Sequence, residues 1–357
     1  MNLNKGNRAV ANWILIGVIM LLVQVILGGV TRLTGSGLSI TEWNVITGAV
    51  PPLNESKWIA EFDKYKQTPQ YQLLNTEFTL SDFKFIFFWE WIHRFWARLI
   101  GVVFVAGFVY LIAKSYLKKE MVQPLLILFL LGALQGAVGW IMVASGLTGD
   151  AVYVKPTRLA LHFIFAMVLI AYAWWFYLQL IVPSKDIITS PKARNFTWWI
   201  LVLIIIQLLF GALMAGHKAA TAAPTWPDIN GELMPEYVFR DKPFLINFIE
   251  NKITIHFVHR TLAYIILVLI VVYTVSLRRI NTGSATFNRT KTIPVILVAV
   301  QVLLGIFSLI SSPGIVPNHW GPFEWLAQLH QVIGMALALS FVSMLYIIRR
   351  SSKLSLH

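Results

Sequence analysis

FKFIFFWEWIHRFWARLIGVVFVAGFVYLIA (residues 83–113) and ITIHFVHRTLAYIILVLIVVYTVSL (residues 253–277) decide the fold of this chain. Each stretch is long enough to cross a bilayer as a helix, which takes about 20 apolar residues. Each also carries a histidine-arginine pair near its first end, beginning at His93 and at His259. Because polar residues inside a membrane segment are costly and mark functional positions, the two stretches point to a site as well as to a fold.

The whole chain has the composition of a membrane protein. Of its 357 residues, 57% are hydrophobic and only 13% are charged, which exceeds the apolar share of soluble domains. Apolar runs of spanning length predict an all-α integral membrane protein with eight transmembrane helices. The predicted spans are 12–32, 85–113, 122–145, 158–182, 196–216, 253–277, 292–311 and 324–348.

The formal net charge of +13 is distributed as in a membrane protein. Basic residues cluster at alternate ends of the predicted spans, and of the sixteen acidic residues only Glu120 and Asp186 share that side. This positive-inside pattern predicts cytoplasmic N- and C-termini and places the long loops 33–83 and 217–251 outside. No nucleic-acid partner is therefore expected.

The N-terminal segment indicates in which membrane the chain lies, and the absence of cysteine excludes several kinds of chemistry. The first apolar run is too long for a signal peptide and shows no small-residue cleavage site, so we expect a retained first helix. No arginine- and serine-rich transit peptide precedes it, which favours a bacterial cell (inner) membrane over an organelle. A chain with no cysteine has no disulfide, thiolate ligand or cysteine nucleophile.

An internal repeat runs through the chain. The offset from His93 to His259 is 166 residues, the same as from Gln135 to Gln301. A repeat of four helices keeps its membrane orientation, so this is a parallel repeat. Glutamine and glycine also serve as helix-packing residues, but packing alone does not explain a shared offset. The first, third, fifth and seventh spans each carry a glutamine followed four residues later by a glycine, as Gln24/Gly28, Gln135/Gly139, Gln207/Gly211 and Gln301/Gly305.

The repeat predicts two tandem four-helix bundles. The N-terminal bundle covers residues 1–182 and includes the large outer loop 33–83. A cytoplasmic linker covers 183–195, and the C-terminal bundle covers 196–357. Four-helix bundles hold cofactors in their cores with side chains from facing helices.

Four histidines in apolar stretches form two matched pairs. His93 and His162 are 69 residues apart, and His259 and His330 are 71 apart. Two imidazoles on facing helices can hold haem iron between them, so two pairs predict two haem sites. The alternative for each histidine is a hydrogen bond between helices. His256 lies three residues before His259 and could be the ligand instead; we favour His259 because it aligns with His93 and precedes an arginine.

The two halves differ at Glu90, which aligns with His256. A buried glutamate there could donate or accept a proton; the alternative is an ion pair with Arg94, four residues further on. Arginines near the proposed sites are predicted to bind haem propionates, and the alternative for them is a contact with lipid phosphate. These arginines are Arg94, Arg98, Arg158 and Arg260.

The outer loops have the composition of folded segments. The first contains Trp43, Trp58 and Pro51-Pro52, and the second contains TWPDINGELMP at 225–235. We expect both loops to act as lids that exclude water from the sites. Structural or solvated roles are expected for the remaining histidines outside the spans, His217, His319 and His357.

Seven motifs of the chain resemble those of one known family, the haem A synthases, with the closest likeness to the cysteine-free branch shared by proteobacteria and mitochondria. The resemblance runs through nearly the whole chain, and the 27–54 and 83–94 stretches are its most specific parts. The motifs are LGGVTRLTGSGLSITEWNVITGAVPPLN (27–54), FKFIFFWEWIHR (83–94), LQGAVGWIMVASGL (134–147), RLALH (158–162), TWPDINGELMP (225–235), HRTLAY (259–264) and LHQ (329–331).

The resemblance implies a membrane enzyme that oxidises one ring methyl of haem O to a formyl group, by two hydroxylations followed by loss of water. It implies a haem b cofactor held by His259 and His330, substrate haem O held by His93 and His162, and a catalytic role for Glu90. The product, haem A, goes to terminal oxidases. Haem O synthase, an electron donor and membrane lipid are the expected partners, and a homo-oligomer is left open.

Two other functions use the same residues. A di-haem cytochrome b would transfer electrons and exchange no substrate. A haem transporter or chaperone would bind haem without oxidising it, and the difference between Glu90 and His256 would then have no purpose. One departure from the family also restricts the mechanism: some bacterial members carry cysteine pairs in their outer loops, and this chain has none.

Overall fold

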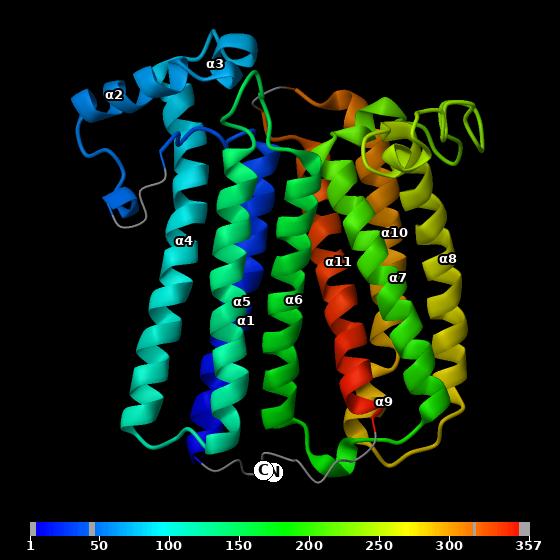
Figure 1. Cartoon of the computed structure of the whole chain (residues 1–357). Helices are drawn as coiled ribbons and strands as arrows, with labels where there is room; N and C mark the ends of the chain where they lie inside the picture. Colours follow the sequence, from blue (N-terminus) through cyan, green and yellow to red (C-terminus); the bar gives the residue numbers. More distant parts are fainter. Residues whose placement is uncertain (1–4, 43–46, 317–318, 350–357) are drawn as a thin grey trace.

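The computed structural model describes residues 5–42, 47–316 and 319–349, and within them the chain is helical with no strand. Eight long apolar helices cross the molecule side by side in these residues (Figure 1), which confirms the predicted all-α membrane architecture. They are α1 (Lys5–Leu33), α4 (Leu80–Ala113), α5 (Lys119–Ala144), α6 (Pro156–Ile181), α7 (Pro191–Gly216), α8 (Lys252–Arg278), α10 (Ile293–Ser311) and α11 (Pro322–Ile347).

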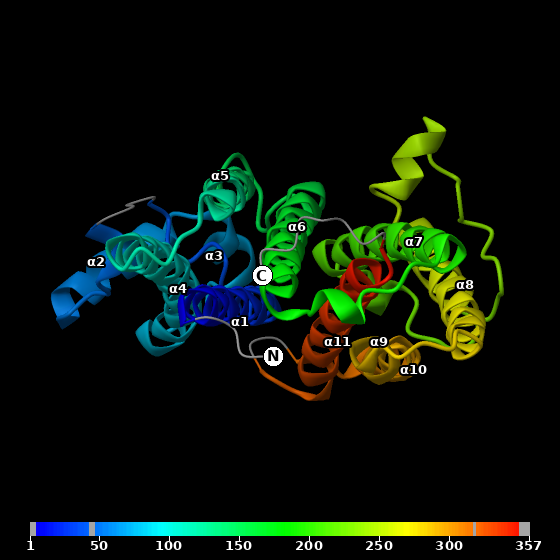
Figure 2. The ribbon, with the colours of Figure 1, turned by 90° about the horizontal axis from the view of Figure 1, so that it is seen from below.

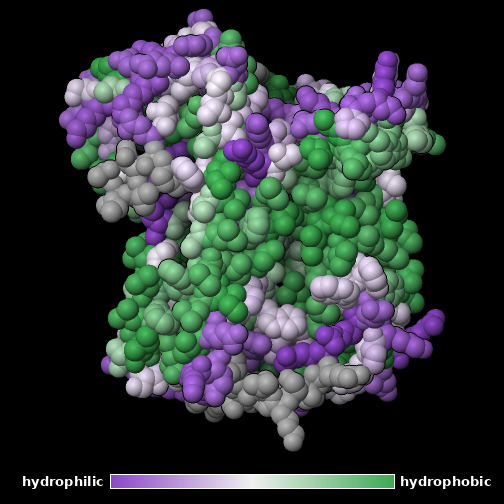
Figure 3. All heavy atoms as spheres, in the orientation of Figure 1, coloured by the Kyte–Doolittle hydropathy of each residue, from purple (hydrophilic) through white to green (hydrophobic). Residues whose placement is uncertain are grey.

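The outer surface of these helices is apolar around the middle of the molecule. Figure 3 shows a hydrophobic band with hydrophilic residues above and below it. Large side chains in the band are exposed, among them Val102, Trp199 and Val268, each at 60% or more. Since helices satisfy their own backbone hydrogen bonds, such a surface is stable in lipid.

The helix ends are set by capping residues that hydropathy does not detect. Thr79 and Asp82 form a reciprocal capping box at the start of α4, and the Asn251 side chain accepts from two backbone N–H groups of α8, which satisfies donors left free at a helix N-terminus. Proline opens several of the other helices, where its missing N–H costs nothing. Those prolines are Pro156, Pro191, Pro294 and Pro322.

Three helices begin five or more residues earlier than predicted because polar residues continue them beyond the apolar run, and one of them is α4, which begins at Leu80. α1 begins at Lys5 and α7 at Pro191, so residues 191–195 of the predicted linker are helical. The rest of that segment contains a short 3-10 helix, η2 (Ser184–Asp186), and a bridge from Ile188 to Ile348.

The helices pack as two neighbouring groups (Figures 1 and 2). In the first half α1 packs against α4 and α6, and α5 packs against α6. In the second half α7 packs against α8 and α11, and α10 packs against α8 and α11. Contacts of α6 with α7 and α11, and of α1 with α11, join the halves. The internal duplication itself stays a prediction.

The two largest buried cores lie away from the long loops. We call the end that carries residues 34–79 and 217–251 the loop end, and the opposite end the basic end. The largest core cluster surrounds Tyr273 and Phe341 in the second half, and another surrounds Phe176 in the first half. All three rings are at most 1% exposed and lie towards the basic end.

The first outer loop is folded, as its aromatic content predicted. It contains α2 (Glu55–Lys66), α3 (Pro69–Leu74) and the 3-10 turn η1 (Thr47–Ala49). An aromatic cluster around Phe62, Tyr65 and Phe83 fixes it to the start of α4. Burial raises the pKa of Tyr65 to about 12, so its hydroxyl stays protonated and hydrogen-bonded to Gln70. Trp43, expected in the lid, lies outside the described residues.

Short helical turns also shape the second outer loop. It contains η3 (Ala219–Ala222) and η4 (Phe244–Phe248). In the helix-free part of this loop, hydrogen bonds from the Thr225 side chain and the Gly231 backbone N–H lower the pKa of the Asp228 carboxyl. The segment that carries the TWPD motif is thus held by its own polar side chains.

Candidate haem sites

The four predicted ligands lie in the loop-end halves of four different helices. His93 is on α4, His162 on α6, His259 on α8 and His330 on α11. All four rings are half-buried. The structure brings them together in the predicted couples: the rings of His259 and His330 meet edge to face, and His93 and His162 lie near each other.

Each histidine ring rests against the glycine of a glutamine-glycine pair on a neighbouring helix. An added Cβ would crowd the imidazole at Gly139, Gly211 and Gly305, whereas at Gly28 it would lie at an ordinary contact distance. The nearest distances from such a Cβ to the ring are 3.4 Å at Gly28 to His93, 2.8 Å at Gly139 to His162, 3.2 Å at Gly211 to His259 and 2.9 Å at Gly305 to His330.

The glutamine of the same pair binds the same histidine residue. The side-chain amide Nε2 donates to the backbone carbonyl of the histidine at 3.1 Å for Gln24, 3.1 Å for Gln135 and 3.0 Å for Gln207. Gln301 instead lies 3.3 Å from the His330 ring nitrogen Nε2. The glutamine-glycine pattern is visible in the sequence, but the histidine that each pair contacts lies on another helix and could not be predicted.

The second-half pair has the separation that a shared metal requires. The ring centres of His259 and His330 are 6.4 Å apart with the ring planes at 75°. Metal–imidazole bonds of about 2 Å on both sides of one ion place the two ring centres roughly 6 Å apart. The Nδ1–H of His330 can donate to the Gln301 carbonyl at 3.0 Å, which leaves Nε2 as the nitrogen available to a metal.

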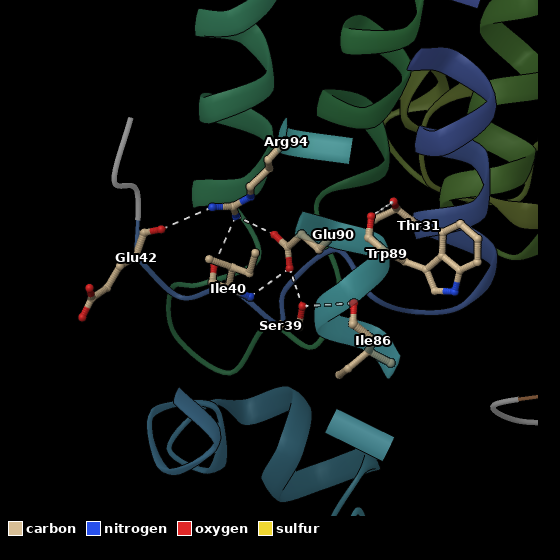
Figure 4. Close-up of polar contacts among 8 residues, drawn as sticks. All are labelled: Thr31, Ser39, Ile40, Glu42, Ile86, Trp89, Glu90 and Arg94. Atoms are coloured by element: carbon tan, nitrogen blue, oxygen red, sulfur yellow. Dashed lines mark hydrogen bonds and ion pairs between the residues drawn. The ribbon is translucent and has the colours of Figure 1, made fainter. Parts of the chain in front are cut away.

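Glu90 is buried at 2% exposure in a complete set of hydrogen bonds (Figure 4). One carboxylate oxygen accepts from the Ser39 hydroxyl at 2.7 Å and from the Ile40 backbone N–H at 2.8 Å. The other pairs with the Arg94 guanidinium. The ion pair weighed from sequence is therefore present, and it is joined by two donors from the outer loop. Neither Ser39 nor Ile40 could be predicted as a partner, because both precede Glu90 by about fifty residues.

The arginine that follows each histidine ties an outer loop to the ligand helix. Arg94 donates to the backbone carbonyls of Ile40 and Glu42 (Figure 4). Arg260 donates to the carbonyls of Thr225, Pro227 and Asp228 at 2.8–3.1 Å. Both guanidinium groups thus hold loop backbone, and their predicted contact with propionates stays a prediction.

Of the other predicted arginines, Arg158 donates to the Ile141 carbonyl at 2.9 Å at the loop end. Arg98 lies one helical turn beyond Arg94, between the site and the middle of α4. Among the remaining histidines, His217 binds the Ile249 carbonyl at 2.6 Å and approaches Glu250 at 3.9 Å, as expected for a structural role. His319 is exposed, and His357 lies outside the described residues.

Comparison with known proteins identifies the family. The sequence matches the family model described as cytochrome oxidase assembly protein (COX15-CtaA) over residues 11–343. It is 39% identical over 355 residues to a protein of Flavobacterium johnsoniae named haem A synthase, covering 98% of this chain and 100% of that protein. The chain belongs to the haem A synthase family.

Further haem A synthases are similar over most of their length. The one from Rhodospirillum centenum is 40% identical over 346 residues, covering 96% of this chain and 89% of that protein. The one from Paracoccus denitrificans is 38% identical over 340 residues, covering 94% and 86%. The resemblance of the motifs to the haem A synthase family is thereby confirmed.

A haem A synthase must bind haem, and the residues present fit that group. Buried polar atoms normally have a partner, yet around these histidines several find none within the described residues. They are both ring nitrogens of His256, Nδ1 of His259, and Oε1 of Gln24, Gln135, Gln207 and Gln301. The unpaired atoms, the glycine surfaces and the 6.4 Å ring separation fit a bound haem better than a packing role for the histidines.

Proposed function

We propose that this protein is a haem A synthase that converts a ring methyl of haem O into a formyl group. The conversion comprises two hydroxylations followed by loss of water and yields haem A for terminal oxidases. It removes electrons and protons from a methyl group that is unreactive at neutral pH, so it requires a redox cofactor. The observation that carries the proposal is the same histidine, glutamine and glycine arrangement at two sites of a chain from this family.

The two sites have different occupants in this proposal. His259 and His330 hold haem b, and His93 and His162 hold the substrate haem O. When bound, haem b supplies one-electron redox chemistry. The protein's own contribution is to orient each imidazole through the glutamine and glycine contacts described above.

Glu90 has the position of a residue that manages charge or protons next to the substrate. It stands one helical turn before His93, and its counterpart in the second half is His256, which is not acidic. A carboxylate held by Ser39, Ile40 and Arg94 is fixed in orientation, as electrostatic stabilisation requires. It can stabilise positive charge that develops at the methyl carbon, or accept a proton from it.

The outer loops keep water from both sites in this proposal. Residues 39–42 cover Glu90 from the loop end, and residues 225–228 lie against Arg260. Exclusion of water strengthens the electrostatic interactions inside a site and prevents side reactions. The guanidinium groups of Arg94, Arg98, Arg158 and Arg260 remain our candidates for the propionates.

The positive-inside charge pattern and the eight spans support our proposal for the location and orientation of the enzyme. We place it in a bacterial inner membrane with cytoplasmic termini, organised as bundles 1–182 and 196–357 joined by the linker 183–195. Haem O synthase and an unidentified electron donor are the proposed partners, and a homo-oligomer is compatible with this arrangement.

Extraction of haem pigments tests the proposed reaction. The full chain is co-expressed with a haem O synthase in cells that make no haem A, and the pigments are separated by chromatography. Haem A, or a hydroxylated intermediate, is the expected result. Haem O alone, with the protein present and loaded with haem, would leave the di-haem cytochrome or the haem carrier as the function.

A further inference from the structure

The two halves differ in how closely their helices meet. In the second half, α8 and α10 pack against each other. In the first half the corresponding helices are α4 and α5, and along residues 80–144 they make no extended contact. The seam between α4 and α5 is therefore open in the half that carries His93 and His162.

An apolar cavity lies in this seam towards the basic end. Its volume is about 160 Å³. Two aromatic rings border it from opposite helices, with Phe104 of α4 and Phe129 of α5 at 6.4 Å between centres. Every lining side chain is apolar, and the lining consists of Phe104, Val105, Phe108, Leu125, Leu126 and Phe129.

Glycines continue the seam from the cavity towards the histidines. Gly101 lies three residues before Phe104 on α4, and Gly132 and Gly136 lie three and seven residues after Phe129 on α5, so each shares a helix face with the cavity lining. A Cβ added at any of these three glycines would meet no atom within 4 Å. At these three positions, which lie between the cavity and the pair His93 and His162, no other part of the chain occupies the space beside the helix.

The length of this path suits an isoprenoid chain. Phe104 lies eleven residues beyond His93 on α4, which at 1.5 Å per residue is about 16 Å. An extended chain advances roughly 3.5 Å for every three bonds, so the backbone of a three-isoprene chain reaches on the order of 13 Å. Starting from the edge of a porphyrin held by His93, such a chain ends in the cavity.

We propose that the seam between α4 and α5, with its cavity at Phe104 and Phe129, binds the isoprenoid tail of haem O. This inference rests on the proposed function. Haem O differs from haem b in carrying that long apolar tail, and the seam is open in the half assigned to haem O and closed in the half assigned to haem b. An opening towards lipid also allows substrate and product to pass sideways through the bilayer without exposing the tail to water.

A spin-label experiment tests this assignment directly. Because the chain has no cysteine, Val105→Cys provides a unique attachment point in the cavity lining, and Tyr110→Cys provides a control at an exposed position on another side of the same helix. The full chain, loaded with its resident haem, is labelled with a nitroxide in lipid nanodiscs. Haem O is expected to immobilise the label at residue 105, whereas haem B, which lacks the tail, leaves it unchanged. The label at residue 110 is expected to respond to neither.

A second variant tests the path, and absorbance titration separates the possible failures. Gly132→Leu places a side chain in the seam and is expected to weaken haem O binding about tenfold through overpacking while haem B binding stays unchanged. If both haems bind but neither the label nor Gly132→Leu distinguishes them, the seam holds only phospholipid chains and the inference is overturned. If neither haem gives an absorbance change beyond the resident haem, the substrate site itself is wrong and the proposed function fails.

Discussion

Gly305→Ala is expected to weaken haem binding in the second half. The added Cβ would stand 2.9 Å from Cε1 of His330, whereas carbon atoms in contact prefer about 3.5 Å or more. The imidazole must therefore retreat by roughly half an ångström, and its ligand geometry changes. Overpacking of this kind costs about 1–3 kcal/mol, which corresponds to roughly 5- to 150-fold weaker haem binding.

Titration of haem B into the haem-depleted protein, followed by the Soret band, measures this affinity. Gly28→Ala is the matched control because it changes the same motif in the first half, where the added Cβ would lie at an ordinary 3.4 Å from His93. Gly17→Ala on α1 meets nothing within 4 Å and controls for helix propensity. If Gly305→Ala binds haem as tightly as both controls, with an unchanged low-spin spectrum, the glycine does not position His330.

Three further predictions address the roles of single residues. His259→Ala is expected to abolish the resident haem, and His93→Ala to retain it; equal haem-to-protein ratios in both variants would contradict the assignment of the halves. Glu90→Gln should keep its haem but lower the haem A yield by about 100-fold or more, so a normal yield would exclude a chemical role. Arg260→Ala leaves three loop carbonyls without their donor, and we expect faster limited proteolysis within residues 217–251; Arg260→Lys should not restore protection, because an ammonium cannot reproduce the guanidinium fork.

Much of the fold could be predicted because a bilayer reduces the problem to length and hydropathy. All eight spans were located, and α10 and α11 matched to within two residues. The starts of α1, α4 and α7 were missed because these helices continue past the apolar run into polar residues, which hydropathy does not detect as helical.

The site was predictable only where its members repeat along the chain. His93 and His259 share a neighbouring arginine and a common offset, so their pairing could be expected. The contact of Gly139 with His162, by contrast, depends on which helix faces which, and the bonds from Ser39 and Ile40 to Glu90 depend on how a loop of some fifty residues folds back. Neither arrangement leaves a periodic signal in the sequence.

The separation of the buried cores from the haem sites has a consequence for how this protein can change over evolutionary time. The two largest buried clusters, around Phe176 and around Tyr273 and Phe341, lie towards one face of the membrane, and the chemistry lies towards the other. Substitutions near the haem sites, at the loop end, therefore change few of the contacts that hold the helices together at the basic end. The outer loops, the surroundings of Glu90 and the seam between α4 and α5 can therefore change step by step in evolution, while the helix contacts at the basic end keep the protein folded in the membrane.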